Sequence, residues 1–220
     1  MENGKTALFA CSMLQDEIEL ALAQTKTECK VVWIDSGLHE YPQRLRYELQ
    51  TKIDENQDAQ LVLLAFCLCG NAVMGLKSKK TTLVIPKFDD CIHMLLAHEP
   101  GAKPQVEASS LYYTKGWLES ERFILNDFKA YQEKYGPKKA SFVINTMLAN
   151  YKGLKLIDTG AYDVAACKEK AVEAANSLGL AFDLVQGTGR VLRDLFCAKY
   201  AGEFVVVAPG ETVESGLFGY

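Results

Sequence analysis

The 220-residue chain is long enough for one large domain or two small lobes, and its 49% hydrophobic content argues against wholesale disorder. A formal net charge of -4 and a pI near 5.5 do not fit a basic nucleic-acid-binding surface. No apolar run approaches the roughly 20 residues of a membrane span, and the first residues lack a signal-peptide pattern. The sequence therefore favours a soluble cytoplasmic protein that binds neither nucleic acid nor membranes.

Four short apolar runs in the first half are typical of strands buried on both faces of a parallel sheet. Helical stretches are predicted between them, at 12–22, where Ser12 is a plausible cap, and at 41–53. The alternation of strand and helix indicates an α/β fold. A further short helix is predicted over 72–77. The strands are predicted at 6–10, 30–35, 60–66 and 82–86.

A candidate metal ligand follows each of these four strands. The carboxyl ends of parallel strands meet along one edge of an open α/β sheet, so side chains from these loops can converge although they are distant in sequence. Thiolates and imidazole are ligands of zinc, and three thiolates can also hold an iron–sulfur cluster. The candidate ligands are Cys11, His39, Cys69 and Cys91.

The number of cysteines is seven, which is odd, and no secretory signal is present, so disulfides are a poor explanation for them. Local Cys-x-x-Cys pairs are missing from the sequence. A metal site built from separate loops suits catalysis or substrate capture better than a purely structural role. We predict Cys11, Cys69 and Cys91 as metal ligands that hold zinc or a [4Fe-4S] cluster. Cys67 is interpreted as a core residue. His39 is predicted as a catalytic residue, with direct metal ligation as its alternative.

Further residues complete the predicted site. Asp90 is expected to orient a ligand or to act beside it in catalysis. Asn71 lies in the predicted turn after the third strand, and we predict that it binds a cofactor. Tyr113 and Trp117 belong to an aromatic segment that would line a cleft and contact the same cofactor. The alternative for both aromatic residues is simple packing in a core.

The second half of the chain echoes the first in three places. The matched pairs of segments are 33–40 with 156–163, 83–86 with 206–209, and 10–14 with 144–148. In this comparison Asn145, Tyr162 and Glu214 stand where the first half has Cys11, His39 and Cys91, which confines the metal ligands to the first lobe.

These matches predict an α/β fold of two related Rossmann-like lobes, with parallel sheets flanked by helices. The predicted domains are an N-terminal α/β lobe with the Cys/His site at 1–96, an aromatic connecting segment and helix at 97–139, and a C-terminal α/β lobe at 140–220.

The same residues carry a family resemblance. The surroundings of Cys11 and His39, the Cys69-Gly70-Asn71 element, the Asp90-Cys91 element, the Tyr112 to Trp117 segment and the Val207 to Gly210 segment resemble a bacterial and archaeal family. That family is catalogued as domain of unknown function sixteen-thirty-eight (DUF1638), and the resemblance covers most of the chain. Because similar proteins are often associated with corrinoid-dependent methyl transfer in anaerobes, the resemblance implies a metabolic context.

The leading hypothesis is a metal-binding protein of anaerobic one-carbon or corrinoid methyl-transfer metabolism. Its substrate would be a small molecule in a cleft between the lobes, and its partner a corrinoid protein or a methyltransferase. The enzymatic version of this hypothesis is a metal-dependent transferase or lyase. One alternative is a non-catalytic binding module for a corrinoid, a small amine or a partner protein. The other alternative is a thiol redox protein that uses Cys67, Cys69 and Cys91.

Overall fold

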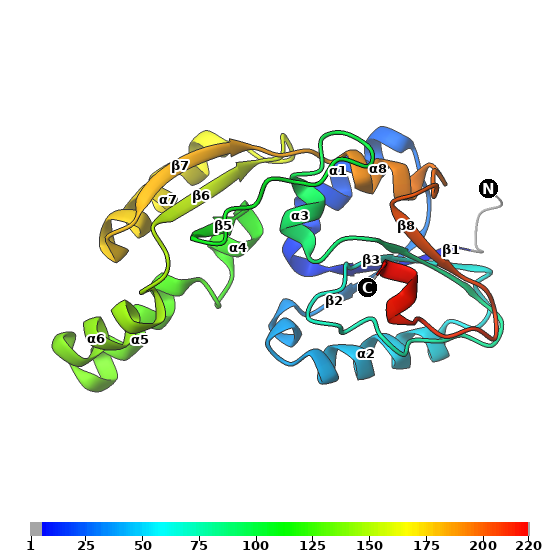
Figure 1. The fold of residues 1–220 in the computed structure, drawn as a ribbon, viewed down its shortest axis with the longest axis horizontal. Helices are drawn as coiled ribbons and strands as arrows, with labels where there is room; N and C mark the ends of the chain where they lie inside the picture. The colour runs from blue at the N-terminus through cyan, green and yellow to red at the C-terminus, as the bar shows by residue number, and fades with distance from the viewer. Residues whose placement is uncertain (1–5, 220) are drawn as a thin grey trace. The chain divides into compact units, whose positions relative to one another are not determined.

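The computed structural model describes residues 6–219 and divides into two compact units (Figure 1). Unit 1 consists of the residues up to 105 together with those from 188 onward, and unit 2 consists of residues 106–187. Each unit has parallel strands flanked by helices, which confirms the predicted α/β fold class. Among the described residues, every helix is too short or too polar to cross a membrane.

Unit 1 contains a sheet with the strand order β2-β1-β3-β4-β8 within the described residues. The first four strands are parallel, and β8 runs antiparallel to β4 along the edge. The strands are nearly continuous apolar runs because helices cover both faces of the sheet. Their bounds are Thr6–Cys11 for β1, Lys30–Ile34 for β2, Leu61–Ala65 for β3, Thr82–Pro86 for β4 and Phe204–Val207 for β8.

Helices cover the two faces of this sheet (Figure 1). One face packs against α1, α3 and α8, because alternate strand residues such as Leu8 and Val84 point to the same side. The other face is covered by α2, whose Leu45, Leu49 and Ile53 are fully buried at spacings of four residues. The helices span Gln15–Thr25 (α1), Pro42–Glu55 (α2), Cys91–Leu95 (α3) and Arg190–Phe196 (α8).

Two predicted helices differ from the structure. The first predicted helix starts with a 3₁₀ turn, Ser12–Leu14, and α1 proper begins at Gln15; the Ser12 hydroxyl accepts a hydrogen bond from Ser36 N–H instead of capping α1. The predicted helix over 72–77 is wrong. The chain there forms consecutive turns, because the residues from Cys69 to Asn71 all have positive φ and break any helix at its start.

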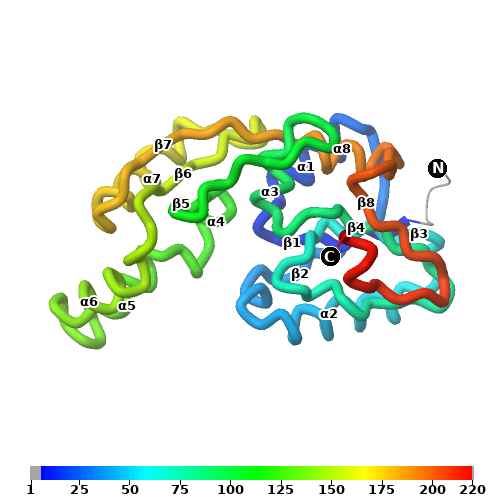
Figure 2. The backbone as a smooth tube through the Cα atoms, in the orientation of Figure 1, coloured from blue at the N-terminus to red at the C-terminus, as the bar shows by residue number. Residues whose placement is uncertain are grey.

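The C-terminal segment runs back along the chain between β3 and β4 (Figure 2). Gly75 N–H donates to the carbonyl of Val213, and Val213 N–H donates to the carbonyl of Leu76. Thr212 forms an isolated antiparallel bridge with Lys77. A 3₁₀ turn, Ser215–Phe218, follows and buries Phe218, so this segment completes unit 1 at the edge of the sheet.

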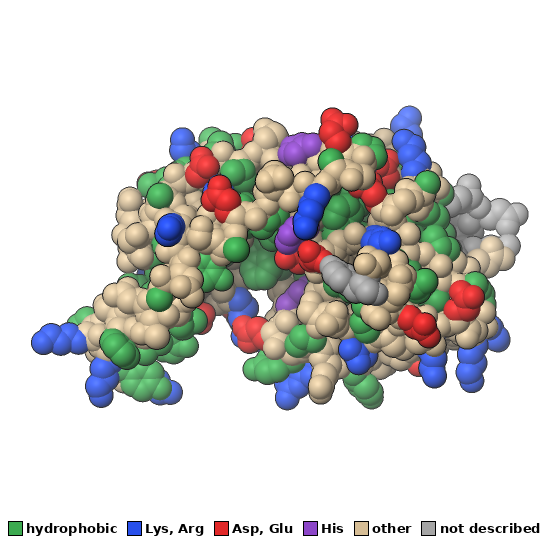
Figure 3. Space-filling model, viewed as in Figure 1, with side chains coloured by type: hydrophobic (Ala, Val, Ile, Leu, Met, Phe, Trp, Pro, Cys, Tyr) green, Lys and Arg blue, Asp and Glu red, His purple; other side chains and the backbone are tan. Residues whose placement is uncertain are grey.

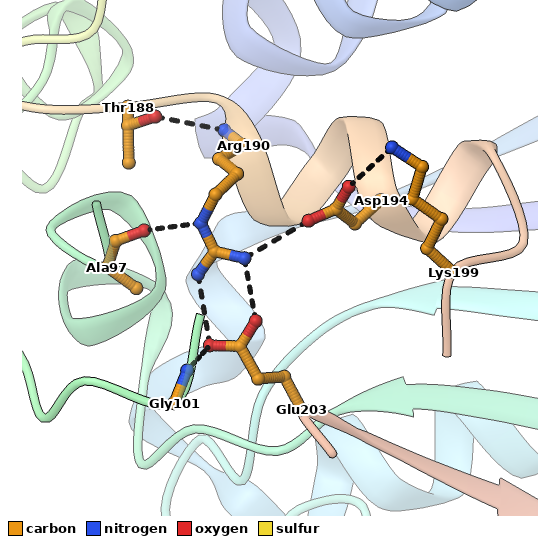
Figure 4. A network of polar contacts seen from close by, with 7 residues as sticks. All are labelled: Ala97, Gly101, Thr188, Arg190, Asp194, Lys199 and Glu203. Atoms are coloured by element: carbon orange, nitrogen blue, oxygen red, sulfur yellow. Dashed lines mark hydrogen bonds and ion pairs between the residues drawn. The ribbon is translucent and has the colours of Figure 1, made fainter. Parts of the chain in front are cut away.

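A polar network centred on Arg190 ties α8 to the start of β8 and to the segment after α3 (Figure 4). The guanidinium donates to both carboxylate oxygens of Glu203, at 2.6 and 3.0 Å, and to Asp194 at 3.1 Å. Its Nε donates to the carbonyl of Ala97, and Glu203 also accepts from Gly101 N–H. These contacts join three segments that lie far apart in sequence.

Unit 2 contains a parallel sheet of strand order β5-β6-β7 within the described residues. Apolar residues of α7, such as Ala171 and Ala175, pack against Leu154 and Leu156 of β6. The helices α5 and α6 pack against each other. The bounds are Ser110–Tyr113 (β5), Lys115–Glu119 (α4), Ile124–Tyr135 (α5), Pro137–Met147 (α6), Gly153–Asp158 (β6), Val164–Leu178 (α7) and Ala181–Gln186 (β7).

Two of the three internal matches do not occupy equivalent places. Asn145 lies on α6 and does not follow a strand as Cys11 does. Residues 206–209 begin in β8, which belongs to the sheet of unit 1, so Glu214 lies in unit 1 as well. The unit boundaries fall at 105/106 and 187/188 instead of at 96/97 and 139/140, because β8 returns to pair with β4.

Candidate functional site

The strand order of unit 1 places its sequence-predicted ligands at a topological switch point. The chain passes from β1 outward to β2 and then back across β1 to β3, so the loops after β1 and β3 leave in opposite directions. In open α/β sheets, ligands bind at the carboxyl edge beside such a point. Cys11 is the last residue of β1, and Cys67 and Cys69 follow β3 directly. Cys91 lies in the loop region after β4, as the first residue of α3.

Cys11 and His39 meet across the first two strand ends. The Sγ atom of Cys11 lies 4.0 Å from Nδ1 of His39, and the same nitrogen lies 3.1 Å from the carbonyl oxygen of Ser36. A carbonyl only accepts, so Nδ1 carries a proton and Nε2 is the nitrogen left for another partner. The ring stacks on Phe66 with centroids 5.9 Å apart. Burial lowers the pKa of His39, and the Ser36 contact offsets this only in part, which favours a neutral imidazole.

The loop that carries Cys69 is held against the loop after β4. Leu68 N–H donates to the carbonyl of Phe88, and Cys69 N–H donates to the carbonyl of Asp89. Cys69 has φ +46°, a left-handed conformation that is uncommon for a residue with a side chain. Such strained positions concentrate at functional sites. Cys67 is fully buried in the core beneath α1, α3 and α8, as its interpretation as a core residue predicts.

The thiols of this edge raise each other's pKa. Burial, and after it the neighbouring Cys91, raise the pKa of Cys11 to about 12. Burial also raises the pKa of Cys69 to about 12, with Cys11 contributing. The pKa of Cys91 lies well above its ordinary value, first through burial and then through Cys69. Three thiols from three separate loops are thus within electrostatic reach of one another.

This electrostatic environment defines what the thiols can do. At neutral pH they are protonated, and a protonated thiol is neither a nucleophile nor a redox-active thiolate. A bound metal centre would displace these protons, because thiolates are the metal-binding form. All seven cysteines of the chain are free of disulfides. The donor set therefore suits a soft metal centre better than thiol redox chemistry.

The two candidate metal centres require different arrangements of thiolates. Within residues 6–219, no group of three or more His, Cys, Asp or Glu side chains is arranged to hold one metal ion. A single zinc ion with bonds of about 2.3 Å draws its thiolates close together. A cluster carries its thiolates on different iron atoms and so accepts a wider arrangement.

Asp90 lies at this edge, and its direct partner is His93, two residues after Cys91. The side chain of Asp90 caps α3, with Oδ1 accepting from His93 N–H at 2.9 Å and from His93 Nδ1–H at 2.7 Å. A carboxylate and an imidazole three residues apart at a helix start are the sequence signal for this pair.

Sequence reasoning missed a second acid, Glu17 of α1. It is 3% exposed and close enough to raise the pKa of Cys91. Its sequence signal is its spacing from Leu14 and Ala21, which puts it on the buried stripe of α1.

Asn71 lines a cavity of about 450 Å³ beside the Cys69 turn. The other lining residues include Leu68, Gly70, Met74 and Asp89. The backbone carbonyl of Asn71 accepts from Arg46 at 2.9 Å, and its φ of +67° gives it a left-handed conformation. Asn71 thus lines a cavity whose wall includes the residues on either side of Cys69, Leu68 and Gly70.

Tyr113 and Trp117 belong to unit 2. Tyr113 packs edge-on against Phe123 and is buried, which raises the pKa of its hydroxyl. Trp117 lies on α4 with its Nε1 buried, and no described residue accepts a hydrogen bond from it. Thr114, at the start of α4, is buried in the same way with its hydroxyl unpaired within the described range. Tyr113 is placed as a core residue, and a contact of either aromatic with a cofactor stays a prediction.

Fold and site together define an α/β protein with a thiol-lined edge at the switch point of its first sheet. The chain matches the family model described as protein of unknown function (DUF1638) over residues 33–196, and it belongs to that family. This confirms the resemblance, and the matched range includes His39, Cys69 and Cys91 but begins after Cys11. No curated protein and no solved structure shows significant similarity to the chain.

Proposed function

We propose that unit 1 holds an iron–sulfur cluster through Cys11, Cys69 and Cys91. The observation that carries the proposal is the mutual electrostatic effect of three thiols that come from three adjoining loops at the switch point. The side chains are partly or fully buried, and buried thiols are common ligands of such clusters. Zinc held by the same three thiols is the alternative metal centre.

A cluster with three cysteine ligands leaves one iron open to bind a substrate as a Lewis acid. The chain itself would supply the substrate contacts. His39, with Nδ1 held by Ser36, offers Nε2 as a proton acceptor or donor beside Cys11. Asn71 would contact a substrate that extends into the neighbouring cavity, which it lines together with Leu68 and Gly70. These groups suit a small polar molecule.

We place this activity in anaerobic one-carbon or corrinoid methyl-transfer metabolism, as a metal-dependent transferase or lyase with a corrinoid protein or methyltransferase as partner. The support for this context is the family resemblance alone. A non-catalytic module for a corrinoid, a small amine or a partner protein is the rival if no metal centre forms. Thiol redox chemistry has less support, because burial keeps these thiols protonated.

A panel of cysteine variants tests the ligand set. Protein purified without oxygen is compared as wild type, Cys11→Ala, Cys69→Ala, Cys91→Ala and Cys197→Ala, with visible absorption and metal content measured for each. Cys197 is the matched control because it is an exposed cysteine of unit 1. We expect loss of the visible band in the first three variants and its retention in the control. Zinc without sulfide in the wild-type protein would show that the metal centre is a zinc site and not a cluster. Retention of the visible band in Cys69→Ala would show that Cys69 is not a ligand.

A further inference from the structure

A second cavity in unit 1, of about 280 Å³, lies beside the loop after β4 and takes no part in the proposed thiol site. It is open to solvent and lined by that loop, by α3, by the segment from Gly101 to Pro104 and by the residues just before β8. On the face drawn in Figure 3, positively charged, acidic and histidine side chains gather near α3. The charged and ring-bearing side chains that line it are Lys87, Phe88, Asp89, His93, Lys103 and Glu203.

The charge of this cavity is positive on balance. Glu203 is neutralised by Arg190, whose guanidinium donates to both of its oxygens, and it also accepts from Gly101 N–H. Lys87 and Lys103 have no carboxylate partner among residues 6–219. Asp89 is the remaining acid of the wall. A concave surface with two ammonium groups and one further carboxylate carries a net positive charge, and it concentrates anions.

A hydrogen-bonding group is fixed in the same wall. Asp90 accepts from both the backbone N–H and the ring Nδ1–H of His93, so the ring is held in one orientation. Since Nδ1 is occupied, Nε2 is the nitrogen that a ligand in the cavity would meet. The ring of Phe88 adds an apolar surface.

We infer that this cavity binds a small organic anion, through a carboxylate or phosphate group held by Lys87 and Lys103 and hydrogen-bonded by His93. The two ammonium groups supply the charge-assisted contacts that such groups prefer, and Phe88 accommodates a short apolar part of the molecule. The inference goes beyond the proposed metal centre, because none of these contacts involves a thiol.

Isothermal titration of the full chain with inorganic phosphate and with succinate, at constant ionic strength, tests this site. We expect one anion per chain with a roughly millimolar or lower Kd. A Lys87→Gln/Lys103→Gln double variant should weaken binding at least about tenfold, and His93→Gln should weaken it by a smaller factor. The matched control is Lys79→Gln/Lys80→Gln, which removes the same charge from exposed lysines of unit 1 outside the cavity and should bind as the wild type does.

Tighter binding of phosphate would identify a phosphorylated ligand, and tighter binding of succinate a carboxylate. Failure of both anions to bind, or equal weakening in the control double variant, would overturn the site. Iron and sulfide are measured on the same samples and should not change in the lysine variants. The measurements can therefore refute the proposed anion site and the proposed metal centre independently of each other.

Discussion

Among the cysteines of unit 1, Cys11 is buried and Cys69 is half-buried at the sheet edge, whereas Cys197 is exposed. This difference controls their reactivity, because alkylating reagents attack the thiolate. With a pKa of about 12, Cys11 and Cys69 present only about one thiolate in ten thousand at pH 8. We expect iodoacetamide to modify Cys197 at least about a thousandfold faster than either in metal-free protein, as followed by peptide mass spectrometry. Equal rates of modification at Cys69 and Cys197 would contradict the raised pKa of the Cys69 thiol.

A second residue-scale prediction concerns Glu203 and acid stability. Burial would raise the pKa of its carboxyl, but hydrogen bonds from Arg190 and Gly101 and the charge of Arg190 hold that pKa below its ordinary 4.5. A carboxyl whose pKa is lower in the folded state than in the unfolded state stabilises the fold above pH 4.5, and this contribution is lost as the pH falls through the folded-state pKa.

Urea unfolding at pH 7, 4 and 3 measures this contribution. The wild type should lose more stability between pH 7 and 3 than Glu203→Gln, and at pH 7 the variant should be less stable by about 1–2 kcal/mol. The control is Glu211→Gln, whose carboxylate accepts from Ala208 N–H at an exposed position. Identical pH profiles for the wild type and Glu203→Gln would count against the network drawn in Figure 4.

At this scale the sequence indicated that the three thiols follow strands, but not what each side chain contacts. Cys11, Cys69 and Cys91 follow apolar runs, and such runs can be read as strands from composition alone. The hydrogen bond between Asp90 and His93 depends on where α3 begins, and helix starts are difficult to predict from sequence. A buried acid on α1 was missed because acidic residues of helices usually face solvent.

At the scale of elements, the turn after β3 depends on left-handed backbone conformations. Gly70 has φ +66°, and a Cβ atom there would lie 3.2 Å from Cγ of Pro42. Gly75 has φ +81° and open space around it. We expect Gly75→Ala to lower the free energy of unfolding by about 1 kcal/mol and Gly70→Ala by about 2 kcal/mol, since only the second adds a steric contact. Urea unfolding of the two variants checks this order, and an equal effect would mean that Pro42 does not constrain the turn.

The first four strands of unit 1 were predicted well, whereas the helix predicted over 72–77 and the start of α1 were not. The run at 82–86 matches β4 at both ends, because flanking polar residues mark the bounds of a buried strand. The segment at 144–148 was matched to the end of a strand, but it lies at the end of α6, since short apolar runs do not distinguish a strand from a helix face.

At the scale of the whole chain, unit 1 is built from two separated stretches of sequence. Its core beneath α1, α3 and α8 uses only residues up to Ala97 and from Val191 onward, whereas the core of unit 2 lies entirely within 106–187. The lobe predicted at 140–220 is divided between the two units, because the return of β8 to the first sheet is a long-range pairing that no local pattern reports.

Each core is complete within its own unit, so unit 1 should fold without unit 2. We expect a chain in which a flexible Gly/Ser linker replaces 106–187 to unfold cooperatively in urea, with the metal content of the full-length protein. The matched comparison is removal of residues 201–220 instead, which deletes β8 and should abolish the cooperative transition. A gradual transition in the linker variant would show that unit 1 depends on unit 2.

The content of iron and acid-labile sulfide in full-length wild-type protein purified without oxygen tests the central claim most directly. We expect about four iron and four sulfide per chain, with a broad visible absorption band. Folded protein that contains neither iron nor sulfide after reconstitution with both would contradict a cluster at Cys11, Cys69 and Cys91.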